Sequence, residues 1–178
     1  MVTATEVTSR TVSGRSIIAA MRASGLEFVV SLPDITTSEG LLRPLSQQVD
    51  IRHLKVCKED EGIGICAGLS YCNRRALMLM QNTGLFDSLN AIRALGGEYS
   101  LPICMMVGLL SKEPERPPRE SSVYSVRIVE PVLEAMEIDH TLIETEADVA
   151  KIKPAIDRAY HGSRPVVLLI GRRPVIGP

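Results

Sequence analysis

The sequence predicts a single-domain α/β protein, in which a mostly parallel sheet is covered by helices on both faces. Apolar runs of strand length alternate along the chain with segments whose apolar residues recur at helical spacing. The apolar runs do not alternate between polar and apolar residues, so both faces of each strand should be buried. A chain of 178 residues is long enough to build one such core.

Helix and strand signals alternate through the first half of the chain. A helix with apolar residues at positions 17, 18 and 21 stops at Gly25, which favours a helix end. A later helix is weakened by Pro44, because proline has no amide proton to donate. Another opens with three acidic residues, which suit the positive end of a helix dipole. The expected elements are helix 13–24, strand 27–32, helix 37–48, strand 51–56 and helix 59–71.

The same alternation continues to the end of the chain. An unbroken apolar run predicts a strand, and the helix after it has apolar residues at positions 85, 89, 92 and 95. The expected elements are strand 75–80, helix 83–95, strand 102–110, helix 131–136, strand 141–144, helix 146–161 and strand 165–170. Residues 111–122 are rich in proline and charge, which predicts an exposed loop. Because this loop leaves the carboxyl end of a strand, a lid over an active site is the alternative.

Composition excludes several classes of function. A net charge of −1 leaves no basic surface for nucleic acid. The longest apolar stretch, residues 101–110, is half of the ~20 residues that a membrane helix needs. The first residues lack the pattern of a signal peptide, so we expect a cytoplasmic protein. The cysteines form no CxxC pair and the three histidines are far apart, so we expect no metal site.

Three segments that contain polar residues follow predicted strands directly. They are Leu32-Pro33-Asp34, residues 58–61 and residues 81–84. Ligands of parallel sheets bind beyond the carboxyl ends of the strands, so these segments should lie at one ligand-binding edge. Each also has a purely structural interpretation: a Pro-Asp turn, solvated carboxylates in a first helical turn, and a helix N-cap at Asn82 or Thr83.

Three glycines follow the acidic residues, at positions 62, 64 and 68. They miss the dinucleotide-binding fingerprint because the third falls one residue late, and the acidic run would repel a pyrophosphate. Glycine weakens a helix by roughly 1 kcal/mol relative to alanine, so the glycines need another reason. Close packing of this helix at an interface explains them better.

In this order and spacing, Leu32-Pro33-Asp34, residues 58–68 and Met80-Gln81-Asn82-Thr83-Gly84 resemble the pyrimidine-binding domain of thiamine-diphosphate enzymes. The chain is most similar to the separate alpha subunit of sulfopyruvate decarboxylase and to the matching domain of phosphonopyruvate decarboxylase. The resemblance covers about residues 13–170. It implies the thiamine-diphosphate-binding fold, with residues 1–178 forming one pyrimidine-binding domain.

The resemblance implies roles for individual residues. In the family, a glutamate followed by a small residue touches N1′ of the cofactor's aminopyrimidine. Glu61, which precedes Gly62, would be this glutamate. Glu59 and Asp60 would then be solvated. Burial against an apolar, glycine-lined wall would let Glu61 share a proton with that nitrogen. Asp34 would assist proton transfers near the substrate. The residues implied to bind the cofactor are Glu61, Asn82, Thr83, Gly84 and Asn90.

The chain departs from these relatives at two places. Phe86-Asp87 stands where the relatives have Gly-Asn, and we expect this difference to alter the size and charge of the pocket. Leu109-Leu110-Ser111 replaces an Arg-Gly stretch that contacts substrate. Lys112, Arg116 and Arg119 could supply the missing positive charge for an anionic substrate, although solvated surface charge is the alternative.

No Gly-Asp-Gly stretch for diphosphate and magnesium occurs in the sequence. The resemblance therefore implies a hetero-oligomer, in which a beta subunit carries the diphosphate-binding domain and holds Mg²⁺. The expected enzyme is a carboxy-lyase, active only with its partner, that decarboxylates a small anionic 2-oxo acid such as 3-sulfopyruvate or 3-phosphonopyruvate. The alternatives are a catalytically silent binding or regulatory module of the same fold, and a flavodoxin-like nucleotide binder, which the lack of a phosphate loop disfavours.

Overall fold

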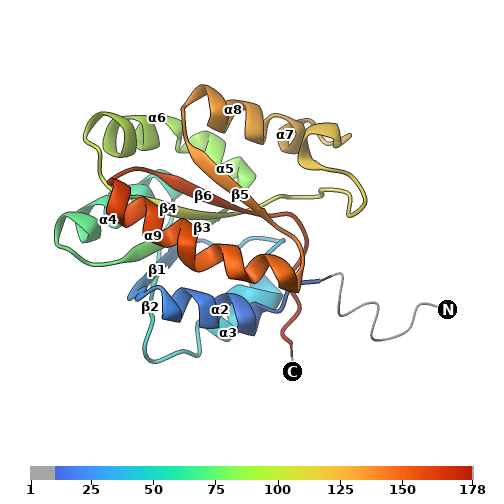
Figure 1. Cartoon of the computed structure of the whole chain (residues 1–178), viewed down its shortest axis with the longest axis horizontal. Helices are drawn as coiled ribbons and strands as arrows, with labels where there is room; N and C mark the ends of the chain where they lie inside the picture. The colour runs from blue at the N-terminus through green and yellow to red at the C-terminus, as the bar shows by residue number, and fades with distance from the viewer. Residues whose placement is uncertain (1–10, 178) are drawn as a thin grey trace.

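A six-stranded sheet runs through the centre of the computed structural model, which describes residues 11–177. Residues 1–10 and 178 of the predicted domain lie outside the described residues. The strand order is β2-β1-β3-β4-β6-β5, and every neighbouring pair is parallel. Helices cover both faces of the sheet (Figure 1). The predicted α/β fold with a parallel sheet between helices is confirmed.

The strands are short and differ in burial according to their place in the sheet. The four inner strands are buried along almost their whole length, as their unbroken apolar sequences predict. Of the two edge strands, β2 has exposed polar residues at both ends and β5 at its first residue, Asp139. The strands are β1 (Phe28–Ser31), β2 (Arg52–Lys55), β3 (Ala76–Gln81), β4 (Cys104–Gly108), β5 (Asp139–Ile143) and β6 (Val166–Ile170).

The helical elements divide into two layers. One layer holds α2 (Gly14–Ala23), the π-helix η1 (Ser38–Leu42), α3 (Arg43–Leu45), the 3₁₀-helix η4 (Glu146–Lys151) and α9 (Ile152–Gly162). The other holds α4 (Glu59–Tyr71), α5 (Asn82–Asp87), α6 (Leu89–Ala91), the π-helix η2 (Ile92–Glu98), the 3₁₀-helix η3 (Pro118–Glu120), α7 (Tyr124–Arg127) and α8 (Val129–Ala135). In Figure 1 these layers lie below and above the sheet, with α9 crossing in front.

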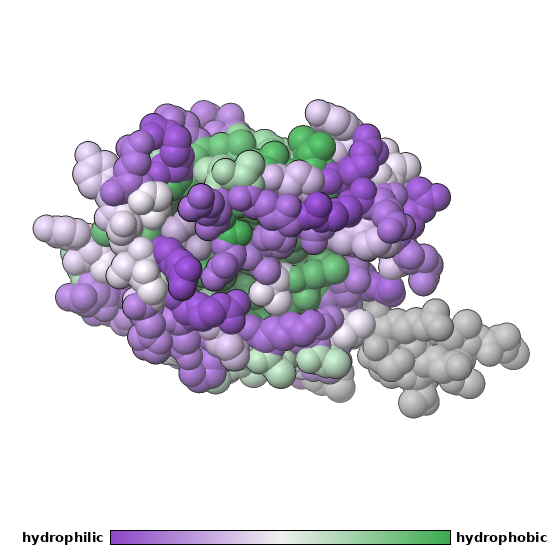
Figure 2. All heavy atoms as spheres, turned by 45° about the horizontal axis from the view of Figure 1, so that its top comes forward, coloured by the Kyte–Doolittle hydropathy of each residue, from purple (hydrophilic) through white to green (hydrophobic). Residues whose placement is uncertain are grey.

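Each face of the sheet has its own apolar core. On the α2 and α9 side, Ile17, Met21 and Ile156 pack against inward side chains of the inner strands. On the α4 and α8 side, Ile63 and Leu133 do the same. Hydrophilic side chains cover most of the surface in Figure 2, and apolar surface forms separate patches between them. The alternate side chains of each inner strand therefore fill two cores, which explains the lack of a polar face.

Two predicted helices are shorter than expected because of proline. The helix expected at 37–48 is a π-helical turn followed by the three residues of α3, with Pro44 near its start. The helix expected at 146–161 begins as the 3₁₀-helix η4 and becomes α-helical only at Ile152. Pro154 stands in the first turn of α9, where a missing amide proton costs no helical hydrogen bond. The helix expected at 83–95 is also divided, into α5, α6 and η2.

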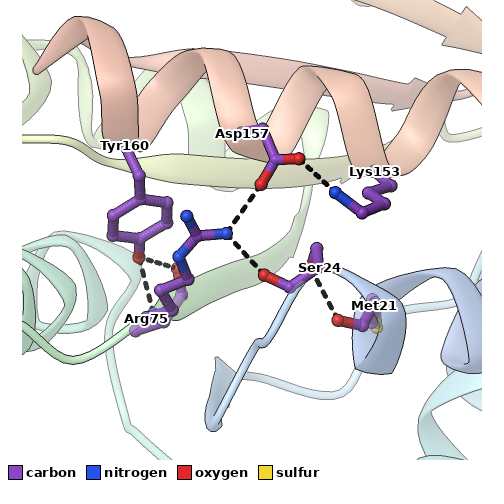
Figure 3. Close-up of polar contacts among 7 residues, drawn as sticks. Met21, Ser24, Arg75, Lys153, Asp157 and Tyr160 are labelled. Carbon is purple, nitrogen blue, oxygen red and sulfur yellow. Dashed lines mark hydrogen bonds and ion pairs between the residues drawn. The ribbon is translucent and has the colours of Figure 1, made fainter.

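A polar network joins β3 to α2 and α9 at the amino edge of the sheet (Figure 3). The Arg75 guanidinium donates to Asp157 of α9 and to the carbonyl of Ser24, which follows α2. The Tyr160 hydroxyl accepts a hydrogen bond from Ala76 N at 2.6 Å and donates to Ala76 O at 2.7 Å. Burial raises the pKa of Tyr160, so the hydroxyl stays protonated and keeps its donor. This network stabilises the edge opposite to the predicted site.

We expect Tyr160→Phe to lower the free energy of unfolding by about 1–3 kcal/mol, because it leaves a partly buried backbone amide without its partner. Urea denaturation followed by circular dichroism measures this quantity. Tyr99→Phe is the matched control, since Tyr99 is exposed. Equal stability of the two variants would show that the Tyr160 hydrogen bonds contribute nothing.

Candidate active site at the carboxyl edge of the sheet

The exits of β1, β2 and β3 lie side by side, because these strands are neighbours in the order β2-β1-β3. Asp34 follows β1, the first turn of α4 follows β2, and α5 begins immediately after β3. The sheet therefore brings the three segments expected from sequence to the same edge. Side-chain geometry then separates the residues that face one another from those that do not.

The first turn of α4 turns its carboxylates in different directions. Glu61 is exposed, and its Oε2 accepts a hydrogen bond from Cys57 N at 3.1 Å. Asp60 accepts from Glu61 N at 2.9 Å and pairs with Lys58 at 3.4 Å. Both side chains thus satisfy groups of their own helix start. In the single chain the buried glycine and alanine of α4 lie on the side of the helix opposite to Glu61, so the burial of Glu61 stays a prediction that depends on the partner subunit.

Glu59 is the carboxylate that turns toward α5. It is half-buried and packs directly on Gly84, where a Cβ would collide with the Glu59 side chain. Among residues 11–177, no hydrogen bond or ion pair engages the Glu59 carboxylate. Glu59 is thus less exposed than Glu61, and the expectation that it is solvated stays a prediction. A half-buried carboxylate without a protein partner beside a glycine is available to a ligand.

Asn82 is fully buried at the exit of β3. Its Oδ1 accepts a hydrogen bond from Leu110 N at 3.0 Å, while its Nδ2 has no partner in the described part of the chain. The prediction of an N-cap at Asn82 or Thr83 is wrong, since Gln81 is the N-cap of α5 and makes no side-chain capping bond. Asn82 ties β3 to the segment after β4 instead. Its unpaired N–H group is costly when buried, which is typical of a group that meets water or a ligand.

The remaining predicted cofactor residues lie less favourably. Thr83 is exposed, and its hydroxyl accepts a hydrogen bond from Gln81 Nε2 at 3.2 Å. Asn90 is exposed on α6 and is bonded to Arg93, so the structure does not bring it to the Gly84 turn. Asp87, in the pair that replaces Gly-Asn, forms an ion pair with Lys58 at 3.3 Å. Asp87 thus links α5 to the start of α4.

Asp34 is buried and closes its own loop. Its Oδ1 accepts from Thr36 N and Thr37 N at 2.6 and 2.7 Å, and its Oδ2 accepts from the Thr37 hydroxyl. Ile35 N donates to Gln81 Oε1 at 3.3 Å, which joins this loop to the exit of β3. The proton-transfer role of Asp34 stays a prediction, while the structure shows an Asx-type turn of the kind that Pro-Asp predicts.

The loop at 111–122 is closed on itself by Glu113. The hydroxyl of Ser121, the hydroxyl of Ser122 and the amide of Ser122 all donate to the Glu113 carboxylate. These hydrogen bonds lower the pKa of Glu113 from 4.5 to about 2, since they favour the charged form. The loop is therefore a tied surface loop, and Arg116 lies exposed at its tip.

The three predicted substrate cations lie in different environments. Arg119 pairs with Glu130 and Glu134 of α8 and so turns away from the strand ends. Lys112, in contrast, has a fully buried side chain and lies 2.6 Å from Glu144, which follows β5. Solvated surface charge, the alternative considered for all three cations, is wrong for Lys112. Sequence reasoning missed Arg172 and Arg173, which follow β6 at the same edge; their place after the last predicted strand was the available signal.

Within residues 11–177, no group of three metal-ligating side chains lies close enough to hold an ion. None of the described helices combines the length and apolar character needed to cross a membrane.

Comparison with known proteins finds relatives over nearly the whole chain. No family model matches it. Sulfopyruvate decarboxylase subunit alpha of Methanococcus maripaludis is 30% identical over 159 residues, which are 89% of this chain and 93% of the relative. The subunit alpha of Methanothermobacter thermautotrophicus is 30% identical over 163 residues, which are 89% of this chain and 94% of the relative.

A solved structure supports the fold. A chain of the 2-oxoglutarate:ferredoxin oxidoreductase from Magnetococcus marinus superposes with a TM-score of 0.65 at 16% identity. The match covers 92% of this chain, which spans 30% of that longer chain. At this identity the likeness concerns the arrangement of strands and helices alone.

We expect the Glu113 carboxylate to titrate near pH 2 in the folded chain, with Ser122 N–H reporting the same midpoint by NMR. Because the folded pKa lies below the ordinary value of 4.5, the loop is stabilised above pH 4.5, and the stabilisation is lost as pH falls through about 2. Ser121→Ala removes one donor and should move the midpoint upward. An unchanged midpoint in Ser121→Ala would contradict the closed loop.

Proposed function

The chain belongs to the family of sulfopyruvate decarboxylase alpha subunits, and from this premise we propose that it is the pyrimidine-binding half of a thiamine-diphosphate-dependent decarboxylase. The substrate is a small anionic 2-oxo acid. The names of the relatives favour 3-sulfopyruvate over 3-phosphonopyruvate, which shares its shape and anionic tail. Residues 11–177 make up the body of the proposed pyrimidine-binding domain.

The observation that carries the proposal is the pairing of Glu59 with the Asn82–Gly84 turn. A half-buried carboxylate and an unpaired buried amide lie at the exits of β2 and β3, on either side of β1, and the Glu59 side chain packs on Gly84, which has no side chain to displace it. These groups fit an aminopyrimidine, which offers ring nitrogens and an amino group for hydrogen bonding. Both polar groups remain unsatisfied by the described residues, so the cofactor would complete their hydrogen bonding.

We assign the proton-sharing role to Glu59 in preference to Glu61. Glu61 is exposed and already accepts a hydrogen bond from Cys57 N, whereas Glu59 is partly dehydrated and unengaged. Proton sharing with a ring nitrogen is strongest where water does not compete for the carboxylate. Glu61 remains the alternative, and the two residues are tested as a pair below.

When bound, thiamine diphosphate supplies the electron sink for decarboxylation. The residues of this chain do the rest. Glu59 would hold or return a proton at a pyrimidine nitrogen, and the Asn82 amide would donate to the ring. The Asn82–Leu110 hydrogen bond keeps that amide oriented, because its oxygen is fixed at 3.0 Å from the backbone. The apolar wall of α4 and α5 excludes water from one side of the site.

A partner chain is part of the proposal. The relatives are designated subunit alpha, and the diphosphate and magnesium ligands would come from the other subunit. The outer face of α4 supports such an assembly: Gly64 and Gly68 are exposed with no atom near their missing side chains, and Tyr71 beside them is 80% exposed. Small residues on a helix face let another chain approach closely.

In the complex of this chain with its partner subunit, we expect Glu59→Gln to slow turnover of 3-sulfopyruvate by ~10²–10⁴-fold, the usual range for general acid–base assistance. Carbon dioxide release measures the rate. Glutamine keeps the shape but cannot exchange the proton.

Glu61→Gln is the matched control. It makes the same chemical change two residues further along α4 and should reduce the rate only slightly. A crippling effect of Glu61→Gln with a mild effect of Glu59→Gln would transfer the role to Glu61. A wild-type complex that binds thiamine diphosphate and releases no carbon dioxide would instead favour the catalytically silent module.

A further inference from the structure

Gln81 is the last residue of β3 and lies where the exits of three neighbouring strands meet. It is paired in register with Gly108 of β4, and β3 pairs with β1 on its other side. Because strand side chains alternate between the two faces of a sheet, Gln81 lies on the same face as Leu77 and Leu79, under α2 and α9. The next residue, Asn82, begins α5 in the other layer. Gln81 therefore stands between the proposed cofactor turn and the segment that leaves β1.

The segment that leaves β1 forms a closed turn, residues 34–38, which we call the β1 turn. The Asp34 carboxylate accepts from the amides of Thr36 and Thr37. The Asp34 amide donates to the Ser38 hydroxyl at 3.0 Å, and the Ser38 amide donates to Asp34 O at 3.2 Å. These amides all find their acceptors within the turn. Only the amide of Ile35, among residues 34–38, bonds to a residue outside it.

Gln81 supplies the acceptor for Ile35 and joins the β1 turn to α5. Its Oε1 accepts from Ile35 N at 3.3 Å, and its Nε2 donates to the Thr83 hydroxyl at 3.2 Å. Gln81 is the N-cap residue of α5 but makes no side-chain capping hydrogen bond, so its amide group is available for this bridge. One side chain thus connects the β1 turn to the first turn of α5.

Glycine at position 108 lets the β1 turn lie against the strand ends. A Cβ at Gly108 would stand 2.8 Å from the Cβ of Thr36, which is closer than real side chains come. The turn therefore lies over the exit of β4 while it bonds to the end of β3. It also carries Ile35, whose side chain is 63% exposed at this edge. Any shift of the turn moves this apolar surface relative to α5.

We propose that Gln81 is a positioning residue for the decarboxylation, because its bridge sets the place of the β1 turn, and of Ile35, relative to the Asn82–Gly84 turn. This inference rests on the proposed function, which places the reaction between these two turns. Displacements of ~1 Å in an active site can lower a rate ~10²-fold. The Asn82–Leu110 hydrogen bond does not involve Gln81. Loss of the bridge should therefore displace the β1 turn and leave the cofactor contacts in place.

The test compares two substitutions of Gln81. Gln81→Met keeps the length of the side chain and removes both hydrogen-bonding groups. Gln81→Glu keeps an acceptor for Ile35 N, and the Thr83 hydroxyl can reverse its role and donate to the second carboxylate oxygen.

The first measurement is amide hydrogen exchange, followed by NMR, in the full chain without its partner. We expect Gln81→Met to speed exchange at Ile35 by up to about tenfold, the loss of one hydrogen bond. Exchange at Thr36 should change little, because its acceptor is Asp34. Gln81→Glu should keep the Ile35 amide protected.

The second measurement uses the complex with the partner subunit. It gives kcat/KM for 3-sulfopyruvate and the Kd of thiamine diphosphate for each variant. We expect Gln81→Met to lower kcat/KM by about tenfold or more and to leave the Kd of the cofactor unchanged. Gln81→Glu should recover most of kcat/KM. A general loss of structure would instead weaken cofactor binding as well.

Gln47→Met is the matched control. Gln47 is exposed and precedes β2 at the opposite edge of the sheet, so its substitution should change neither measurement. Unchanged exchange at Ile35 in Gln81→Met would overturn the inference. Faster exchange with an unchanged kcat/KM, or equal losses of kcat/KM and cofactor affinity, would also overturn it. A wild-type complex that binds thiamine diphosphate and releases no carbon dioxide would defeat the proposed function, and faster Ile35 exchange in Gln81→Met would then still support the bridge.

Discussion

The hydrogen bond from Leu110 N to Asn82 Oδ1 is the contact on which the carboxyl edge depends. It joins the exits of β3 and β4, and its acceptor, Asn82, is fully buried. On one side of it lies the Gly84 turn, which packs against Glu59. On the other side the chain turns at Ser111, where φ is 61°, into the loop of residues 111–122. A single buried amide thus positions both the proposed cofactor contacts and the start of that loop.

The first turn of α4 shows how helix geometry gives neighbouring residues of the same type different roles. Successive residues of an α-helix point about 100° apart. Glu59 turns inward onto α5, while Asp60 and Glu61 turn outward and satisfy donors at the start of their own helix. Gly62 then lets the helix approach Met78 of the sheet. The helix must lie close to β3 for Glu59 to reach Gly84, so packing and site geometry are coupled.

The sheet could be predicted from sequence because its inner strands are unbroken apolar runs. The three segments at its carboxyl edge followed from the parallel direction of those strands. Which carboxylate faces the site could not be predicted, because it depends on the rotation of α4 relative to α5. Lys112 was expected in a charged loop, and only the contact with Glu144, 32 positions further along the chain, explains its burial.

The central claim is that Glu59, and not Glu61, meets the cofactor. It can be tested directly by NMR of the assembled complex with ¹³C-labelled glutamate carboxyl groups, assigned with the Glu59→Gln and Glu61→Gln variants. On addition of thiamine diphosphate and magnesium, the account predicts a large change in the Glu59 carboxyl resonance and little change in that of Glu61. A shift of the Glu61 resonance with an unmoved Glu59 resonance would contradict it.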